Sequence, residues 1–326
     1  MLNDNKKLIP IFFASDDNYI PFLDIAIRSL IENASLNYNY VINILNSGLK
    51  QENIDLIKKQ ETDIFKINFC NITEDLEPIK NKLRNVYHYG LAAYYRFFIE
   101  ELFPQYDKAI YLDCDIVVLG DISKLYETNV ENYFVAAVND RIVMSNDVFK
   151  DYVRTVVGVE PDKYFSSGIL VINLKKFRES KICKQFICLI HKYNFETVAP
   201  DQDYLNVLCK DRVHYLPNGW NKQTIPVPLE GDLNIVHFAL YKKPWEVSGI
   251  INEEYFWKYA KQSPFYEEII NRKNNFTEEM LKKKEANNVK IVEDALRIMQ
   301  SEITFNKTLT KINNFIYAIL DVNNRR

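Results

Sequence analysis

Two aspartates follow a short apolar run closely enough to act together. Asp113 and Asp115 come directly after residues 109–112, with only Cys114 between them. In an extended chain, side chains two positions apart point to the same face, so the two carboxylates converge. Like charges at short range repel, and burial increases the cost unless a cation compensates. Hard oxygen donors suit Mg²⁺ or Mn²⁺, so the pair predicts a divalent metal site, with a solvated acidic loop as the alternative.

A histidine and a lysine pair form a second group. His237 lies in the apolar run of residues 235–238, and Lys242 and Lys243 follow it. A neutral imidazole is a suitable third ligand for a metal held by carboxylates. A lysine ammonium group can contact a phosphate as a point charge. A histidine satisfied within the core and a solvated lysine pair are the alternatives.

Polar residues also follow the first apolar run of the chain, residues 8–14. Asp16 and Asn18 stand there, with Tyr19 next to them. Carboxylate and amide groups at this point are suited to contacting a base edge or a ribose. Such residues at a strand-to-helix turn also serve as helix caps and turn residues, which is the alternative.

The elements that must position these groups are predicted by alternating periodicities. Helical patterns begin at Pro21 and cover residues 51–60 and 91–102. They alternate with strand-like runs at residues 8–14, 41–45, 64–69, 109–112, 134–138 and 168–174. This alternation predicts an α/β domain whose largely parallel sheet is covered on both faces. Ligands of such sheets bind outside the carboxyl ends of the strands, where Asp16 and Asp113 are expected to lie.

The last part of the chain has a different character. Residues 271–326 hold eleven lysines and arginines against seven acidic residues, whereas the whole chain has a net charge of −3. Apolar residues recur there at helical spacing, namely Val289, Val292, Leu296, Met299 and Ile303, and then Ile312, Phe315, Ile316 and Ile319. We therefore expect a domain over residues 1–270 and a helical region over 271–326. The helices either pack on the domain or form a docking surface for a membrane or a partner.

Composition and missing motifs exclude several classes of protein. No long basic stretch is interleaved with aromatic residues, so nucleic acid is not expected as a partner. The five cysteines include no CxxC pair, which disfavours a zinc site or a disulfide framework and indicates a reducing compartment. The run at residues 8–14 is too short for a signal peptide, so a cytoplasmic location is expected. The chain has no GxGxxG, GxxxxGK[ST] or GxSxG motif, which disfavours dinucleotide-dependent dehydrogenases, P-loop enzymes and esterases.

The order and spacing of these segments resemble the retaining glycosyltransferases of family 8, which include bacterial lipopolysaccharide galactosyltransferases and glycogenin. The resemblance covers roughly residues 8–245. It implies a GT-A fold, a single Rossmann-like nucleotide-sugar-binding domain with a mostly parallel mixed sheet. It also implies transfer of a hexose from a UDP-sugar, with UDP-glucose or UDP-galactose favoured, and dependence on Mn²⁺ or, alternatively, Mg²⁺. Cell-surface polysaccharide synthesis, with a saccharide, lipid-linked or protein-linked acceptor, is the implied setting. Peripheral attachment to the inner face of the membrane and homo-oligomerisation both stay open.

The resemblance assigns a role to individual positions. The metal ligands are Asp113, Asp115 and His237, and Lys243 contacts the diphosphate. Arg96 touches the donor sugar or its phosphates, and Asp140 lies near the acceptor. The remaining assignments are Ala14, Asp16, Asn18 and Tyr19 around the uridine, and Ser166, Gly168, Asp201 and Gln202 at the donor sugar.

Two departures from the family pattern bear on the substrate. Ser166 stands where the family has an asparagine that contacts the sugar, and residues 238–241 lack the family's glycine between His237 and Lys243. These changes support the rival interpretation of a catalytically inactive nucleotide-sugar-binding protein. A nucleotidyltransferase is disfavoured because residues 15–21 contain no glycine-rich loop. Self-glucosylation is the third alternative, although none of the 21 tyrosines stands out as its acceptor.

Overall fold

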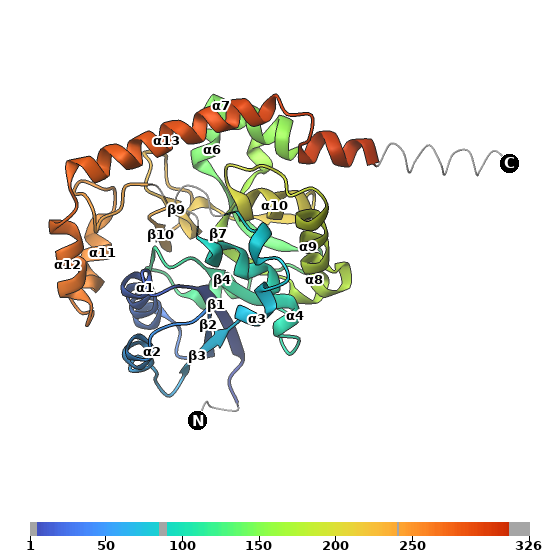
Figure 1. The fold of residues 1–326 in the computed structure, drawn as a ribbon. Helices are drawn as coiled ribbons and strands as arrows, with labels where there is room; N and C mark the ends of the chain where they lie inside the picture. The colour runs from blue at the N-terminus through green and yellow to red at the C-terminus, as the bar shows by residue number, and fades with distance from the viewer. Residues whose placement is uncertain (1–4, 85–89, 240, 313–326) are drawn as a thin grey trace.

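The computed structural model describes residues 5–84, 90–239 and 241–312, and a seven-stranded mixed sheet runs through its centre (Figure 1). The strand order is β3-β2-β1-β4-β7-β6-β8. The strands are β1 (Leu8–Ala14), β2 (Asn39–Asn46), β3 (Phe65–Asn71), β4 (Ala109–Leu112), β6 (Val135–Asn139), β7 (Phe165–Ile172) and β8 (Val213–Tyr215). The expected strands at residues 8–14 and 109–112 have these bounds in the structure.

One central strand runs against its neighbours. The strands β1 to β4 pair in parallel, and β6 pairs with β8 in parallel, but β7 is antiparallel to both β4 and β6. The expectation of a mostly parallel mixed sheet is therefore confirmed. The reversal matters for the site, because Leu112 at the carboxyl end of β4 pairs with Ile169, and residues 165–168 of β7 therefore extend beyond that end of β4. The first residues of β7 thus lie at the edge of the sheet where ligands bind.

Apolar residues cover both faces of the sheet, as the near-continuous hydrophobic strands predict. Within β1, Ile11 and Phe13 pack into the core on one face and Phe12 into the core on the other. The first face is covered by α1 (Ile20–Asn33), α11 (Glu253–Ala260) and α12 (Tyr266–Asn274). The second is covered by η2 (Leu91–Phe98), α8 (Leu174–Ser180), α9 (Ile182–Lys192) and α10 (Pro200–Leu208).

A small second sheet lies beside the first. It consists of β5 (Ile116–Val118), β10 (Ile235–His237) and β9 (Lys222–Gln223), in the order β5-β10-β9. The antiparallel pairing of β5 with β10 places His237 opposite Ile116. Since Ile116 follows Asp115 directly, this register brings the histidine to the acidic pair across 122 positions of sequence.

Apart from the 22-residue helix α13 (Glu278–Met299), the other labelled helices of the described residues are short. They are α2 (Gln51–Lys58), α3 (Thr73–Leu76), η1 (Lys80–Lys82), α4 (Ile99–Leu102), α5 (Ile122–Tyr126), α6 (Arg141–Met144), α7 (Asp147–Tyr152), η3 (Val153–Val157), η4 (Pro161–Lys163) and η5 (Asn218–Trp220). Residues 305–312 are also helical. The helix expected over residues 91–102 is a 3₁₀ helix, η2, continued by one turn of α4. The strand expected at 168–174 starts earlier, because the ladder between Asn139 and Phe165 extends it past two serines.

The C-terminal helices pack on the domain, as the first of the two alternatives for the tail predicts. Figure 1 shows α13 running from the neighbourhood of α12 to that of α7. Ala295 and Ile298 are buried against Tyr152 and Val156. The expected boundary at residue 270 lies inside α12 (Tyr266–Asn274). The division into a domain over 1–270 and a helical region over 271–326 stays a prediction. The helical spacing of Phe315, Ile316 and Ile319 falls outside the described residues.

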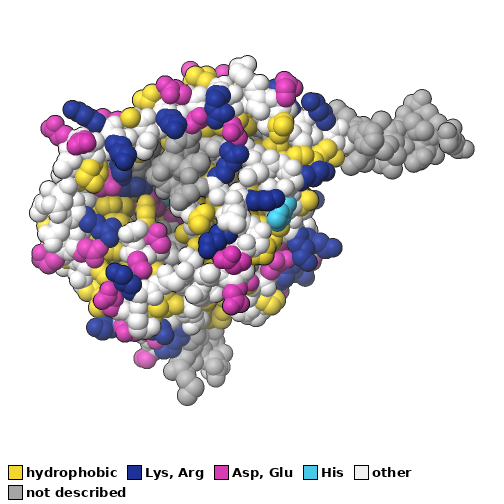
Figure 2. All heavy atoms as spheres, viewed as in Figure 1, with side chains coloured by type: hydrophobic (Ala, Val, Ile, Leu, Met, Phe, Trp, Pro, Cys, Tyr) yellow, Lys and Arg dark blue, Asp and Glu magenta, His cyan; other side chains and the backbone are white. Residues whose placement is uncertain are grey.

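The described part of the chain contains no helix with the length and apolarity that a bilayer crossing requires. On the face shown in Figure 2, basic and acidic side chains are intermixed over the surface. That face therefore presents no broad patch of a single sign.

Candidate active site

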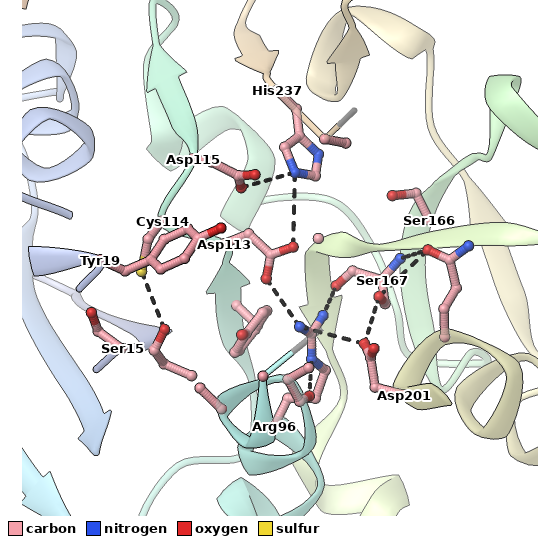
Figure 3. A pocket seen from close by; sticks show the side chains of 18 of the residues that line it. Ser15, Tyr19, Arg96, Asp113, Cys114, Asp115, Ser166, Ser167, Asp201 and His237 are labelled. Atoms are coloured by element: carbon pink, nitrogen blue, oxygen red, sulfur yellow. Dashed lines mark hydrogen bonds and ion pairs between the residues drawn. The ribbon is translucent and has the colours of Figure 1, made fainter. Parts of the chain in front are cut away.

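A cavity lies where the carboxyl ends of β1 and β4 meet the start of β7 (Figure 3). Its volume, including the open mouth, is about 970 Å³. The lining comes from segments far apart in sequence and includes most of the residues expected from the sequence, namely Ala14, Asp16, Tyr19, Arg96, Asp113, Asp115, Asp140, Ser166, Gly168, Asp201, Gln202, His237 and Lys243. Asn18 is the exception, because it lines a neighbouring cavity that shares Tyr19 and Lys243 with the first.

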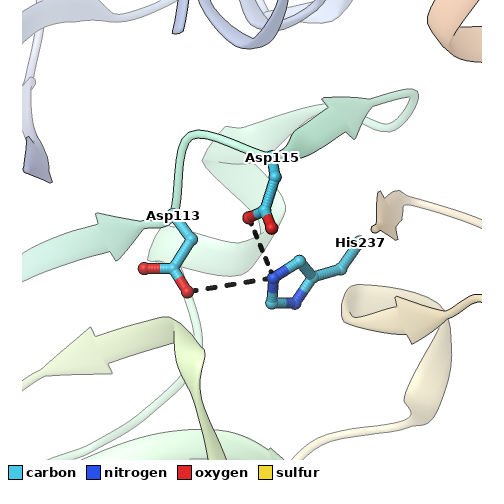
Figure 4. Close-up of side chains that lie close together, drawn as sticks. All are labelled: Asp113, Asp115 and His237. Carbon is cyan, nitrogen blue, oxygen red and sulfur yellow. Dashed lines mark hydrogen bonds and ion pairs between the residues drawn. The ribbon is translucent and has the colours of Figure 1, made fainter. Parts of the chain in front are cut away.

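Asp113, Asp115 and His237 line this cavity and lie close together (Figure 4). One ligand atom from each lies within 4.8 Å of the others. The Nε2 atom of His237 is 3.2 Å from Oδ1 of Asp115 and 3.8 Å from Oδ2 of Asp113. Two carboxylates and an imidazole form a donor set that suits Mn²⁺ or Mg²⁺. The residues present therefore fit a divalent cation.

Asn221 orients the imidazole. Its Oδ1 atom is 2.9 Å from Nδ1 of His237, whose side chain is buried. With the proton on Nδ1 donated to this amide oxygen, the lone pair of Nε2 faces the carboxylates, an arrangement that is common around metal-binding histidines. No sequence pattern pointed to Asn221, because the loop that carries it lies next to β10 only through the small sheet.

Because Gly168 has no side chain, it leaves room for Asp113 and His237. A Cβ atom at this position would lie 2.7 Å from Oδ2 of Asp113 and in closer contact still with Cε1 of His237. The backbone nitrogen of Asp113 donates to the carbonyl oxygen of Gly168 at 2.8 Å, which holds β7 against the acidic loop. Any side chain at this position would push the histidine and the carboxylate apart.

Two cations balance the acidic pair. Nζ of Lys243 is 2.7 Å from Oδ2 of Asp115, and Nη2 of Arg96 is 3.0 Å from Oδ1 of Asp113. Burial alone raises the pKa of Asp115, but the charge of Lys243 and the contact with His237 hold the pKa of this carboxyl below its usual value. Burial raises the pKa of Asp113 despite Arg96. The two carboxyls of one site are thus driven in opposite directions, and a bound cation would favour the charged form of both.

Arg96 is fixed on several sides. It is only 4% exposed, and its guanidinium group lies 4.1 Å from the ring centroid of Tyr111. Besides Asp113, it contacts Oδ2 of Asp201 at 3.4 Å and donates to the carbonyl oxygens of Ala93 and Ser167. Figure 3 shows it pointing from η2 into the space between the two aspartates. Such an arginine can neutralise charge at the site without moving.

Asp201 and Gln202 are held by β7. The hydroxyl of Ser167 donates to Oδ2 of Asp201 at 2.8 Å, and its backbone nitrogen donates to Oε1 of Gln202 at 3.0 Å. The amide nitrogen of Gln202 donates to Oδ2 of Asp140 at 2.8 Å. Both carboxamide ends are therefore engaged, and Gln202 links Ser167 to Asp140, the residue expected near the acceptor.

Asp140 is also a helix cap. Its Oδ1 atom accepts from the backbone nitrogens of Ile142 and Val143 at 2.9 and 3.2 Å, at the start of α6. Gln223 donates to the same oxygen at 3.3 Å. The sequence did not point to Gln223 or Asn221, because neither belongs to a motif and each reaches the site only through tertiary packing. Ser167 lies in the segment that resembles the family, between Ser166 and Gly168, but no role was assigned to it from sequence.

Comparison with known proteins agrees with this geometry. A sequence model of glycosyl transferase family 8 matches residues 10–249. A putative glycosyltransferase of Haemophilus influenzae is 30% identical over 254 residues, which cover 77% of this chain and 74% of the relative. The lipopolysaccharide 1,2-glucosyltransferase of Escherichia coli K12 is 25% identical over 277 residues, 80% of this chain and 79% of the relative.

Among solved structures, the galactosyltransferase LgtC in complex with donor and acceptor sugar analogues superimposes with a TM-score of 0.66. The match covers 78% of this chain and 96% of that chain at 23% sequence identity. This likeness shows that the fold is of the GT-A type. The chain belongs to glycosyltransferase family 8.

Proposed function

We propose that this enzyme transfers a hexose from a UDP-sugar, with UDP-glucose or UDP-galactose as donor, and retains the configuration at the anomeric carbon. The observation that carries the proposal is the convergence of Asp113, Asp115 and His237 beside Lys243 and Arg96. The E. coli relative is a glucosyltransferase and the solved neighbour a galactosyltransferase, which supports these two sugars.

The residues that hold the metal also locate the diphosphate. A divalent cation bound to Asp113, Asp115 and His237 would supply Lewis acidity toward the leaving group. Lys243 is close enough to Asp115 for its ammonium group to reach a phosphate bound there. Such a charge stabilises negative charge that develops on the leaving diphosphate. The Ala14, Asp16 and Tyr19 end of the cavity is left for the uridine.

Asp201 and Gln202 define the donor-sugar end. Asp201 is 2% exposed and is engaged by both Arg96 and Ser167, which suits an orienting group better than a nucleophile. Gln202 carries an amide, which is a poor nucleophile. We therefore favour attack from the front face: the bond from the anomeric carbon to the phosphate oxygen breaks, the acceptor oxygen bonds to that carbon, and the acceptor proton passes to the leaving phosphate oxygen.

Replacement of each residue separates this mechanism from a double displacement. We expect Gln202→Ala to lower kcat by at least about tenfold, since it removes the link between Ser167 and Asp140. Asp201→Ala should also be slow, without a covalent glycosyl adduct in either variant by intact-protein mass spectrometry. A near-normal rate for Gln202→Ala, together with an adduct on Asp201 in the wild type, would contradict front-face attack.

The acceptor end is marked by Asp140. Its carboxylate lines the cavity next to Gln202 and is positioned by α6 and Gln223. A carboxylate at this place accepts hydrogen bonds from sugar hydroxyls, which fits a saccharide acceptor, free or linked to lipid or protein. The positive charge of residues 271–326 supports peripheral attachment to an anionic membrane, where a glycolipid acceptor is found.

The reaction class is tested by UDP release from a panel of UDP-sugars in the presence of Mn²⁺ and without an acceptor. We expect slow hydrolysis of UDP-glucose or UDP-galactose in preference to the other donors, and its loss in Asp113→Asn. The rival function is a nucleotide-sugar-binding protein without catalytic activity, which Ser166 in place of asparagine favours. UDP binding without turnover of any donor, with a panel of saccharide acceptors also present, would support that rival.

A further inference from the structure

Helix α13 lies outside the residues matched to the family, yet it borders a second cavity next to the donor site. This cavity has a volume of about 880 Å³, including its open mouth. Tyr19 and Lys243 line both cavities, so the two spaces adjoin across these side chains. The far wall consists of Lys284, Asn287, Asn288 and Ile291 of α13.

Salt bridges tie α13 to the loop that carries Lys243. Nζ of Lys284 contacts the two carboxylate oxygens of Glu246 at 2.5 and 2.6 Å and donates to the carbonyl oxygen of Tyr241 at 3.2 Å. One residue further along the helix, Glu285 is 3.0 Å from Nζ of Lys242. The helix therefore contacts this loop on both sides of Lys243.

The loop that carries Asn18 also contacts the C-terminal helices. Arg272 in α12 donates from Nη1 to the carbonyl oxygen of Asn18 at 2.8 Å. At its other end, α13 is anchored by the burial of Ala295 and Ile298 against the domain and by Arg297, which is 2.6 Å from Glu196. The position of α13 over the cavity is thus fixed at both ends.

The face that α13 turns toward the cavity follows from its sequence. Lys284, Asn287, Asn288 and Ile291 are spaced as residues on one side of an α-helix. Lys284 is used in the salt bridge, whereas Asn287 and Asn288 are exposed at the open side of the cavity, and their side chains form no hydrogen bond with the residues that the structure describes. Each carboxamide offers two donor hydrogens and one acceptor oxygen, so the pair presents unused polar groups to the cavity.

The donor's geometry indicates which part of it would reach this wall. Under the proposed function, Asp113, Asp115, His237 and Lys243 would hold the diphosphate, and Asp201 with Gln202 would face the sugar. The nucleoside would then extend the other way, toward Tyr19, which also lines the second cavity. We propose that α13 forms the outer wall of the nucleoside subsite, where Asn287 and Asn288 hydrogen-bond to the nucleoside of the donor. This inference rests on the proposed function.

Calorimetry with two ligands tests the proposal in the full chain. UDP and inorganic pyrophosphate, each with Mn²⁺, are titrated into the wild type, the double variant Asn287→Ala/Asn288→Ala, and Lys290→Ala. Lys290 is an exposed residue of α13 that does not line the cavity, which makes it the matched control. Alanine favours a helix more than asparagine does, so the double variant is expected to fold.

We expect the double variant to bind UDP about tenfold more weakly, which corresponds to the loss of one or two hydrogen bonds. Its affinity for pyrophosphate should match the wild type, and Lys290→Ala should bind both ligands as the wild type does. Unchanged UDP affinity in the double variant would overturn the inference, as would an equal loss of pyrophosphate affinity. A wild type that binds pyrophosphate but not UDP would overturn the proposed function as well. The wild type therefore tests the proposed function, and the double variant tests the role of α13.

Discussion

At the scale of single residues, the site depends on shape as much as on charge. Gly168 makes no polar contact through a side chain, yet the space it leaves is what allows His237 to approach Asp113. Asn221 then selects which imidazole nitrogen faces the carboxylates. The candidate metal ligands could be predicted from sequence because their types and spacing indicate a chemistry, and the structure brings them together. The amide that orients them could not, because it is one of many polar loop residues.

A methyl group at position 168 should therefore weaken metal binding. In Gly168→Ala the added carbon collides with Asp113 and His237, and we expect affinity for Mn²⁺ to fall about 10–100-fold, the range for disturbed ligand orientation. Titration calorimetry with Mn²⁺ measures this. Gly90→Ala is the matched control, because a Cβ there meets nothing within 4 Å. Equal metal affinity in both variants would show that the crowding does not matter.

Asp203 is a buried carboxyl beside the site that gives the fold a pH dependence. Burial raises its pKa to about 7, even though the hydroxyls of Tyr164 and Tyr152 donate to it at 2.6 and 2.8 Å. The native state therefore holds this proton more tightly than the unfolded chain does. Its contribution to stability is full below the usual aspartate pKa and is lost as the pH rises toward 7.

We expect the free energy of unfolding to fall by about 2–3 kcal/mol between pH 5 and 8 through this residue, at about 1.4 kcal/mol per pH unit up to its native pKa. The carboxamide introduced by Asp203→Asn cannot ionise, so this variant should lack that part of the dependence. Urea unfolding of both proteins at the two pH values gives the difference. Parallel pH profiles of the two proteins would rule out a raised pKa at Asp203.

At the scale of elements, most strands of the large sheet and the first helices between them could be predicted from periodicity, whereas the helices from α5 to α10 and the strands of the small sheet were not predicted. The runs at residues 8–14 and 109–112 are apolar and isolated by polar residues, and both form the strands expected. By contrast, β5, β9 and β10 contain three residues or fewer, too few to show a period. The reversed direction of β7 is also invisible in a pattern of apolar residues, because the same pattern fits either direction.

The packing of α13 on the domain gives an element-scale prediction. Ile298→Ala removes a buried side chain from the cluster around Tyr152 and Val156, and we expect a loss of about 2–4 kcal/mol in the stability of this contact. Amides of α13 should then exchange hydrogen faster while those of β1 and β4 do not. Val289→Ala, at a position that is 58% exposed, is the control and should change little. Uniformly faster exchange in the sheet would contradict a local role.

At the scale of the whole molecule, the C-terminal region borders a cavity that adjoins the candidate active site. The sequence predicted a helical tail, either packed or available for docking, but its contacts with the loops of Asn18 and Lys243 join residues up to 254 positions apart. No local pattern encodes pairing over such a distance. If the tail served only to dock on a membrane, its removal would spare donor hydrolysis, whereas the contacts of Arg272 and Lys284 predict a loss.

A chain that ends at residue 270 should therefore lose two properties. We expect its affinity for UDP to fall at least about tenfold, because the loop that carries Lys243 loses the contacts of Lys284 with Tyr241 and Glu246. It should also no longer sediment with anionic liposomes, if the basic region is the membrane anchor. Lys284→Met in the full chain serves as the control, with weakened UDP binding and normal sedimentation. Unchanged sedimentation of the shortened chain would exclude the tail as the anchor.

Titration calorimetry of UDP into the protein, first with Mn²⁺ and then with EDTA, tests whether Asp113, Asp115 and His237 form a metal-dependent site for the diphosphate of a UDP-sugar. We expect UDP binding that requires the metal and is lost in Asp115→Asn and in His237→Ala. Equal affinity for UDP with and without metal, or full metal-dependent binding in both variants, would contradict it.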